Sequence, residues 1–212
     1  MQQVSDCEVE QNRNRKGKTE EMSRGDAVSM AERKNCEIDR SDQRCDGQTA
    51  EYWDLCDASG INLGEQILRG EPHPPGTYHI VVCVWIWNSK GQVLLTLRSQ
   101  KKKQFPGLWE GLGGSAQAGE TSLESIVREV KEEIGLDFPP ECFVLLKRSL
   151  EKTALVDIYE LKADFAVEDL KLQTEEVDQA IWATEEELQQ IISEGKFSAA
   201  ALRRWEAVER AD

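Results

Sequence analysis

Residues 114–136 read GSAQAGETSLESIVREVKEEIGL, and this segment carries the clearest structural signal in the chain. Thr121 and Glu124 have the spacing of a capping box, in which a hydroxyl and a carboxylate satisfy backbone amides at a helix start. Apolar residues then recur at helical spacing, at Leu123, Ile126, Val127, Val130 and Ile134. Gly135 follows them and is typical of a helix C-terminus. The sequence therefore predicts a helix that begins after Thr121 and ends at Gly135.

Three glutamates of this helix lie on a stripe of their own, apart from the apolar residues. At about 100° per residue, Glu129, Glu132 and Glu133 share one face. Like charges at this spacing cost about 0.2–0.5 kcal/mol per pair, so they need full solvation or a compensating cation. Hard divalent cations such as Mg²⁺ and Mn²⁺ prefer carboxylate oxygens. The residues alone leave two interpretations open, a solvated acidic face and a divalent-metal site.

The residue spacing in this segment matches the Nudix box without a departure. The pattern is Gly, five residues, Glu, seven residues, Arg-Glu, an aliphatic residue, any residue, Glu-Glu, any residue, Gly and an aliphatic residue. The matching residues are Gly114, Glu120, Arg128, Glu129, Val130, Glu132, Glu133, Gly135 and Leu136. A chance match in a chain of this composition is on the order of one in a million. The chain therefore resembles the Nudix hydrolase superfamily, which implies an α/β (α+β) fold, an α/β/α sandwich with a mixed sheet.

The resemblance implies catalytic and metal-binding roles for the carboxylates of the box. Glu129, Glu132 and Glu133 would ligate one or more ions of Mg²⁺ or Mn²⁺, and a backbone carbonyl of Gly113 or Gly114 would add an oxygen. Bound metal ions neutralise a diphosphate, lower the pKa of a bound water, and stabilise the attacking and leaving oxygens. Glu133 is the first choice for the general base.

Two further assignments follow from the resemblance. Arg128 would act in catalysis by pairing with a carboxylate, Glu120 or Glu129, and so orienting the site. Nudix enzymes differ in where the general base lies, and Glu175 and Glu176 are the second choice for it. Ordinary surface charge is the alternative for these two residues.

Outside the box, roughly residues 51–183 resemble the branch that contains type I isopentenyl diphosphate isomerases and their hydrolase-like relatives. The similar segments are 52–54, 79–87, 94–98 and 102–109. In this branch an Arg and a Lys before a Pro-Gly turn hold the diphosphate of the substrate. The resemblance thus makes Arg98, Lys102 and Lys103 candidates for substrate binding, with a solvated basic loop as the alternative.

The chain departs from the isomerases on both sides of the first glycine of the box. The isomerases have a catalytic Cys before that glycine and a metal-binding His after it, whereas this chain has Gly113 and Ser115. Without the thiol, no obvious acid or base protonates an alkene, so hydrolysis is favoured over isomerisation. His73 and His79 could correspond to other metal histidines of the isomerases, but a structural role is expected for both.

Hydrophobic patterning predicts the remaining elements. They are a hairpin over 51–70, strands over 78–87, 92–98, 142–150, 153–163 and 180–183, a short glycine-rich strand and loop over 108–116, and helices over 184–195 and 198–210. The strand over 78–87 is apolar on both faces, which is typical of a buried central strand. Because a turn separates 78–87 from 92–98, we expect these two strands to form a hairpin.

Composition limits the compartment and the partners. Residues 1–50 contain no Leu, Phe, Tyr or Trp, which predicts a disordered tail before a Nudix hydrolase domain at 51–212, with Met22 or Met30 as alternative starts. The chain has 26 Lys and Arg against 40 Asp and Glu, a net charge of −14, which disfavours nucleic-acid polymers and anionic membranes. The apolar run over 80–87 is too short to cross a bilayer, and no signal-peptide pattern precedes it, so we expect a cytoplasmic protein.

The sequence thus predicts a Nudix hydrolase that cleaves the diphosphate bond of a nucleoside diphosphate linked to another moiety, or of a similar small diphosphate. Isopentenyl diphosphate isomerase activity is one alternative. A non-catalytic module that binds a nucleotide is another, although a pure binding site has little need of three unscreened carboxylates. The resemblance also implies a homodimer, because Nudix domains often form one.

Overall fold

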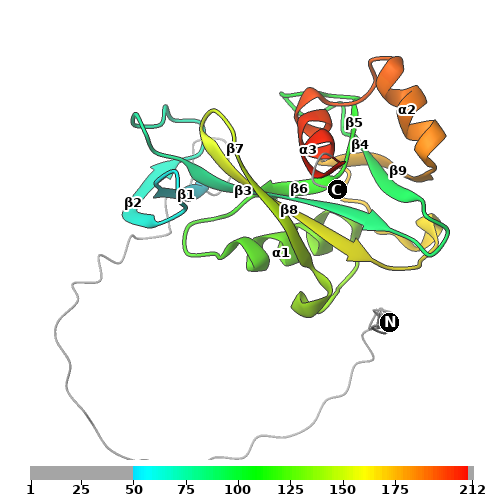
Figure 1. The fold of residues 1–212 in the computed structure, drawn as a ribbon, viewed down its shortest axis with the longest axis horizontal. Helices are drawn as coiled ribbons and strands as arrows, with labels where there is room; N and C mark the ends of the chain where they lie inside the picture. Colours follow the sequence, from blue (N-terminus) through cyan, green and yellow to red (C-terminus); the bar gives the residue numbers. More distant parts are fainter. Residues whose placement is uncertain (1–49, 210–212) are drawn as a thin grey trace, which may run out of the picture. The chain divides into compact units, whose positions relative to one another are not determined.

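The computed structural model of the protein describes residues 50–209, whose elements are labelled in Figure 1. The strands are β1 (Tyr52–Cys56), β2 (Asn62–Leu68), β3 (His79–Trp87), β4 (Val93–Arg98), β5 (Trp109–Glu110), β6 (Leu112–Ser115), β7 (Val144–Leu150), β8 (Ala154–Lys162) and β9 (Val177–Ala183). The helices are α1 (Ser122–Ile134), α2 (Glu185–Ser193) and α3 (Ala199–Glu209), with short 3-10 helices η1 (Pro140–Cys142) and η2 (Val167–Asp169). Apart from Ala50, the predicted tail lies outside the described residues.

The strand β3 lies in the middle of a mixed sheet. The order of the sheet is β5-β4-β3-β8-β7, with β6 also paired to β3 and β9 to β4. β3 and β8 run parallel, from the pair His79 and Ala154 to the pair Trp87 and Lys162, whereas the other pairings in this sheet are antiparallel. The predicted buried central strand is confirmed, since most of β3 is inaccessible to solvent.

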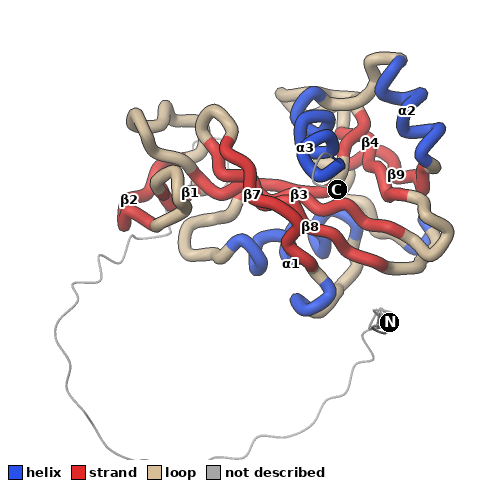
Figure 2. The backbone as a smooth tube through the Cα atoms, viewed as in Figure 1, coloured by secondary structure: helices blue, strands red, loops and turns tan. Residues whose placement is uncertain are grey.

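Helices cover both faces of this sheet (Figures 1 and 2). On one face, Val82 and Val84 belong to the same buried cluster as Val130 of α1. On the other face, Cys83 and Trp85 pack in a second cluster with Trp205 of α3. This second cluster also includes side chains of α2. Alternate residues of β3 therefore serve two cores, and the predicted α/β/α sandwich with a mixed sheet is confirmed.

The predicted hairpin between residues 78–87 and 92–98 is wrong beyond its turn. β3 and β4 pair only at Trp87 and Val93. Farther along, β3 takes β6 and β8 as neighbours, and β4 takes β5 and β9. Two adjacent apolar strands look the same in sequence whether they pair along their length or separate, because periodicity reports burial and not the partner.

The glycine-rich segment over 108–116 accounts for this separation. The sequence predicts one short strand and a loop here, but the segment forms two strands, β5 and β6, which pair with β4 and β3 respectively and so join the two diverging strands. The split occurs at Gly111, where an added Cβ would lie 2.7 Å from the ring of Trp85. This bend fixes Glu110 and Gly114 on two different strand pairs.

Other local predictions are confirmed. The hairpin over 51–70 is present as β1 and β2, which form a separate two-stranded sheet. Thr184 caps α2 through a second capping box, and Ser198 precedes α3, with its hydroxyl accepting the Ala201 amide at 3.1 Å. The last strand begins at Val177, earlier than the expected residue 180. In the described part of the chain, no helix is long and apolar enough to span a membrane.

Candidate active site

The capping residues fix the helix α1 at both ends, as predicted. The Thr121 hydroxyl accepts the Glu124 amide at 3.2 Å, and the Glu124 carboxylate accepts the Thr121 amide at 2.8 Å. Gly135 ends the helix in the left-handed region with φ of 74°, which favours glycine. Ile126 and Val130 are fully buried in the core beneath the sheet. The stripe of glutamates on α1 is thereby held away from that core.

Arg128 connects the carboxylates of the box. Its Nε and Nη2 donate to the two oxygens of Glu120 at 2.7 and 2.9 Å, a bidentate pair. Its Nη1 donates to Glu129 at 2.9 Å and to Glu132 at 3.0 Å. Nη2 also donates to the backbone carbonyl of Ser115 at 3.2 Å. The sequence left open whether Glu120 or Glu129 pairs with Arg128, and the structure has both pairs.

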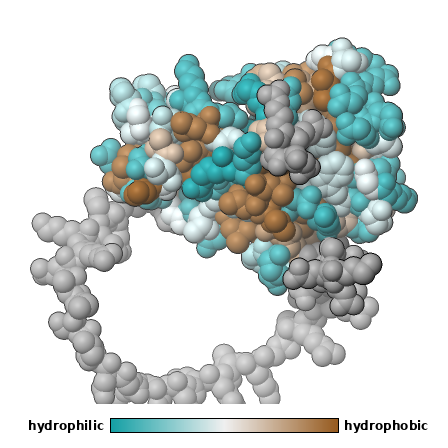
Figure 3. All heavy atoms as spheres, viewed as in Figure 1, coloured by the Kyte–Doolittle hydropathy of each residue, from teal (hydrophilic) through white to brown (hydrophobic). Residues whose placement is uncertain are grey.

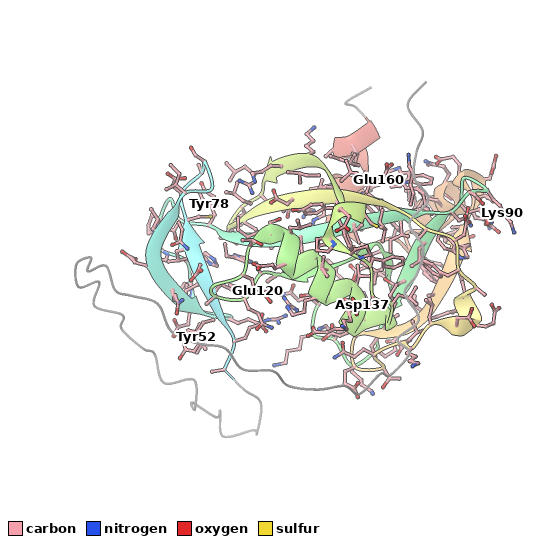
Figure 4. All side chains as sticks on the ribbon, turned by 90° about the horizontal axis from the view of Figure 1, so that it is seen from below. Tyr52, Tyr78, Lys90, Glu120, Asp137 and Glu160 are labelled. Atoms are coloured by element: carbon pink, nitrogen blue, oxygen red, sulfur yellow. The ribbon has the colours of Figure 1, made fainter. Side chains whose placement is uncertain are left out.

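Glu120 lies just before α1, as its label in Figure 4 shows. Burial alone would raise the pKa of Glu120, but hydrogen bonds from Arg128 and from the Gln117 amide outweigh it and lower this pKa. The carboxylate is therefore held as an anion, and it fixes the position of the guanidinium.

Gly114 lets the carboxylate of Glu129 approach the backbone of β6. An added Cβ at Gly114 would lie 2.2 Å from Oε1 of Glu129, so a larger residue would displace this carboxylate. Burial raises the pKa of Glu129, and the ion pair with Arg128 lowers it in part. The first glycine of the box thus has a steric function here, next to its predicted role as a source of a carbonyl oxygen.

Glu133 is the carboxylate of the box that lacks a direct partner for its side chain. Its exposed fraction is 8%, and among the described residues its side chain has no hydrogen bond and no ion pair. Burial raises the pKa of Glu133 well above its ordinary value, and the negative charges of Glu129, Glu110 and Glu176 raise it further. The negative charges of carboxylates from α1, from β5 and from the turn before β9 thus all raise the pKa of Glu133.

Glu110 belongs to this site although sequence analysis did not identify it. It forms an ion pair with Arg98 and accepts a hydrogen bond from the Ser198 hydroxyl at 3.3 Å. Burial raises the pKa of Glu110, and Arg98 lowers it in part. A signal was available, because Glu110 is the one charged residue in the sequence between Lys103 and Glu120.

The three candidate cations for substrate binding differ in their contacts, and two of them pair with carboxylates. Arg98 is fixed by Glu110 and by the Gln104 carbonyl, which accepts from its Nε at 3.0 Å. Lys102 pairs with Glu176, so both lie close to Glu133. These contacts bring two of the predicted substrate-binding residues to the carboxylates.

The remaining predicted residues lie in solvent. Lys103 is exposed, with no hydrogen bond or ion pair for its side chain within residues 50–209. Glu175 forms a loose pair with Lys101 at 3.7 Å, and both side chains are mostly exposed. Of the two second-choice bases, Glu176 is therefore the one near the other carboxylates.

The donor set fits a hard divalent cation in type and charge. Its atoms are carboxylate oxygens, and the uncompensated charge at Glu133 is one that a cation would neutralise. Within residues 50–209, however, no three His, Cys, Asp or Glu side chains stand close enough together to hold an ion. The guanidinium of Arg128 pairs with the carboxylates of Glu129 and Glu132.

The two histidines lie at the N-terminal hairpin. The His79 ring stacks on Trp53, with centroids 3.9 Å apart, and its Nδ1 lies 3.0 Å from the Thr153 carbonyl and 2.9 Å from Nε2 of His73. Burial lowers the pKa of His79 to about 4. These contacts agree with the expected structural role.

The model of the NUDIX domain matches residues 77–206, more than half of the chain. The chain therefore belongs to the Nudix family and is a Nudix hydrolase, as the box predicts. An uncharacterized Nudix hydrolase of Listeria monocytogenes is 36% identical over 148 residues, which cover 69% of this chain and 88% of the relative.

Two further proteins extend the comparison. An isopentenyl-diphosphate Δ-isomerase of Escherichia coli is 34% identical over 90 residues, 41% of this chain and 49% of the isomerase. The crystal structure of DR0079 from Deinococcus radiodurans has a TM-score of 0.61 and 25% identity, covering 74% of this chain and 98% of that protein. The predicted likeness to the isomerase branch thus extends to about half of an isomerase.

Proposed function

We propose that the protein is a divalent-metal-dependent hydrolase of the diphosphate bond in a nucleoside diphosphate linked to another moiety, or in a similar small diphosphate. One observation carries the proposal. A complete Nudix box folds into a cluster in which Arg128 holds Glu129 and Glu132, while the buried Glu133 beside them has no ion pair or hydrogen bond within residues 50–209.

Glu129, Glu132, Glu133 and the carbonyl of Gly114 would hold Mg²⁺ or Mn²⁺. When bound, such an ion neutralises the diphosphate and acidifies a water molecule. Arg128, itself fixed by Glu120, orients two of the carboxylates.

Glu133 is the proposed general base, because its carboxylate is buried and free to accept a proton from the attacking water. Glu176 is the second choice and lies closer to the cluster than Glu175. Arg98 and Lys102 are proposed to bind the diphosphate oxygens, and the exposed Lys103 would reach the outer part of the substrate.

Isomerisation of isopentenyl diphosphate is the alternative suggested by the Escherichia coli relatives. Steric crowding at Gly113 opposes it. An added Cβ there would lie 2.2 Å from the carbonyl oxygen of Val82, so the position has no room for the cysteine expected of that branch. A binding module without catalysis is the other alternative, and the complete set of box carboxylates argues against it.

Phosphorus NMR tests the proposal. Purified protein with Mg²⁺ is incubated with nucleoside triphosphates, ADP-ribose, coenzyme A and isopentenyl diphosphate. We expect loss of the diphosphate resonances of one panel member, and loss of this activity in Glu132→Gln. No turnover of any member by protein that binds Mn²⁺ would contradict the hydrolase and favour the binding module.

Homodimer formation and a cytoplasmic location stay predictions. Apolar side chains gather on the face shown in Figure 3, over β7 and β8, and the exposed ones of β7 support an interface there. They are Val144, Leu145, Leu146 and Leu150. Sedimentation equilibrium checks the dimer, and a monomer at micromolar concentration would contradict it.

A further inference from the structure

The hairpin of β1 and β2 lies before residues 77–206, the region that matches the NUDIX domain. Asp54 holds its two strands together. Its Oδ1 accepts a hydrogen bond from Gln66 at 2.8 Å, and its Oδ2 accepts one from Asn62 at 3.3 Å. Asp54 thus acts inside the hairpin as a link from β1 to β2.

The same carboxylate reaches outside the hairpin to the loop over 116–120, between β6 and α1. Oδ2 of Asp54 accepts the amide of Gly119 at 2.8 Å. The neighbouring amide of Ala118 donates to the carbonyl of Tyr52 at 2.8 Å. The strand β1 therefore fixes two consecutive amides of this loop.

The loop ends at the residue that holds Arg128. Glu120 follows Gly119 directly, and its carboxylate also accepts the Gln117 amide at 2.9 Å within the loop. The bidentate contact from Glu120 to Arg128 depends on the position and angle of both partners. A displacement of Gly119 would therefore change the position of the guanidinium that binds Glu129 and Glu132.

Other contacts hold the hairpin to the main sheet independently of Asp54. Cys56 and Tyr78 exchange two backbone hydrogen bonds, at 2.8 and 2.9 Å. Trp53 stacks on His79, and Gly60 lies so close to Arg148 that an added Cβ would be 2.5 Å from its Nη1. Loss of the Asp54 side chain would consequently remove the hydrogen bond to Gly119, while the backbone bond from Ala118 to Tyr52 and the docking of the hairpin remain.

We propose that the hairpin supports the active site and that Asp54 is a positioning residue, which holds Glu120 and Arg128 in place through the Gly119 amide. The proposal rests on the proposed function for its effect on turnover. It extends the site beyond residues 77–206, which match the NUDIX domain, to a segment that carries no residue of the box.

Three variants of the full chain test this proposal. Asp54→Ala removes the acceptor for Gly119, whereas Asp54→Asn keeps a carbonyl oxygen in the same place. Asp57→Ala is the matched control, because Asp57 accepts the amides of Ser59 and Ile61 in the same hairpin and has no hydrogen bond to the loop. Asp54→Ser, whose side chain is too short to reach Gly119, replaces the alanine variant if that variant does not fold.

Two measurements need no substrate, namely amide exchange of Gly119 by NMR and Mn²⁺ affinity by electron paramagnetic resonance. In Asp54→Ala we expect Gly119 exchange to rise about tenfold or more, as for the loss of a hydrogen bond to a charged group. Mn²⁺ affinity and kcat should fall by about 10- to 100-fold, as for other groups that support metal ligands, with KM little changed. Asp54→Asn should recover most of each loss, and Asp57→Ala should stay within about twofold of the parent protein.

Two results would overturn the proposal. One is a folded Asp54→Ala protein with parental Gly119 exchange and Mn²⁺ affinity, and the other is an equal loss in Asp57→Ala, which would indicate a merely structural hairpin. Absence of turnover in the parent protein would count against the proposed function alone, since the exchange and Mn²⁺ measurements would still decide the role of Asp54.

Discussion

Helix α1 and the loop after β4 both carry charged residues of the site, but their partners come from different distances along the chain. In α1, Arg128 pairs with three glutamates that are at most eight residues away. At the end of β4 and in this loop, Arg98 and Lys102 pair with acidic residues 12 and 74 residues away. The first arrangement is local enough to be written in a motif, whereas the second exists only once the sheet has formed. Glu133 lies near both groups and forms an ion pair with neither, although the positive charge of Arg98 lowers its pKa in part.

The largest expected effect comes from neutralising the carboxylates of α1. Glu129→Gln and Glu133→Gln should each lower kcat by about a hundredfold or more, because metal-ion stabilisation contributes several kcal/mol and each 1.36 kcal/mol is tenfold. Glu124→Gln is the matched control, since glutamine also completes a capping box. Steady-state kinetics measure both, and an equal loss in the control would mean that helix stability, not the cluster, limits turnover.

A smaller effect on turnover is expected for Glu120, which acts on the carboxylates of α1 through Arg128. Glu120→Gln removes the negative charge of the bidentate partner of Arg128 and should lower kcat by about 10- to 100-fold, as for other residues that orient metal ligands. The same kinetics, with Mn²⁺ affinity alongside, measure it. Turnover within twofold of the parent would show that Arg128 keeps its position without Glu120.

A substitution in the loop after β4 should weaken substrate binding and leave the chemical step unchanged. Lys102→Ala should raise KM about tenfold with little change in kcat, since a charge-assisted hydrogen bond to a phosphate oxygen contributes about 1.5 kcal/mol or more. Lys90→Ala, at the far end of the sheet in Figure 4, is the control for a lost positive charge. A fall in kcat at constant KM would place Lys102 with the α1 group and remove the distinction between the two regions.

The smallest expected effect concerns stability without metal. Glu133→Gln replaces a buried, unpaired carboxylate by a neutral amide, so in EDTA it should raise Tm by a few degrees while abolishing turnover. Thermal unfolding of the parent and of Glu124→Gln supplies the comparison. An unchanged or lower Tm would mean that the charge of Glu133 is compensated in solution.

The same distinction explains how much the sequence predicts. The helix and its caps follow from spacings within one or two helical turns, and the contacts of Arg128 follow from the resemblance to the Nudix box. The structure has all of them. The alternation of apolar residues also predicts β3 as a central strand. It does not predict that β3 and β4 separate, because the segment that joins them divides at Gly111, where a tryptophan of another strand leaves no room for a side chain.

The missing members of the site are those whose contacts join separate strands and loops of the folded chain. Glu110 faces the other carboxylates only because the segment over 108–116 splits between two strand pairs. Likewise, the contact of Asp54 with Gly119 joins residues 65 positions apart. No local pattern encodes such a contact, whereas the position of Lys102 before a Pro-Gly turn was enough to select it as a candidate.

The most direct test of the account is hydrolysis in water enriched in oxygen-18, followed by phosphorus NMR of the products. We expect one labelled oxygen in a product phosphate when Mg²⁺ is present, and no labelled product with EDTA or with Glu129→Gln. Turnover without label in any phosphate, or equal labelling by Glu129→Gln, would contradict metal-dependent hydrolysis by the carboxylates of α1.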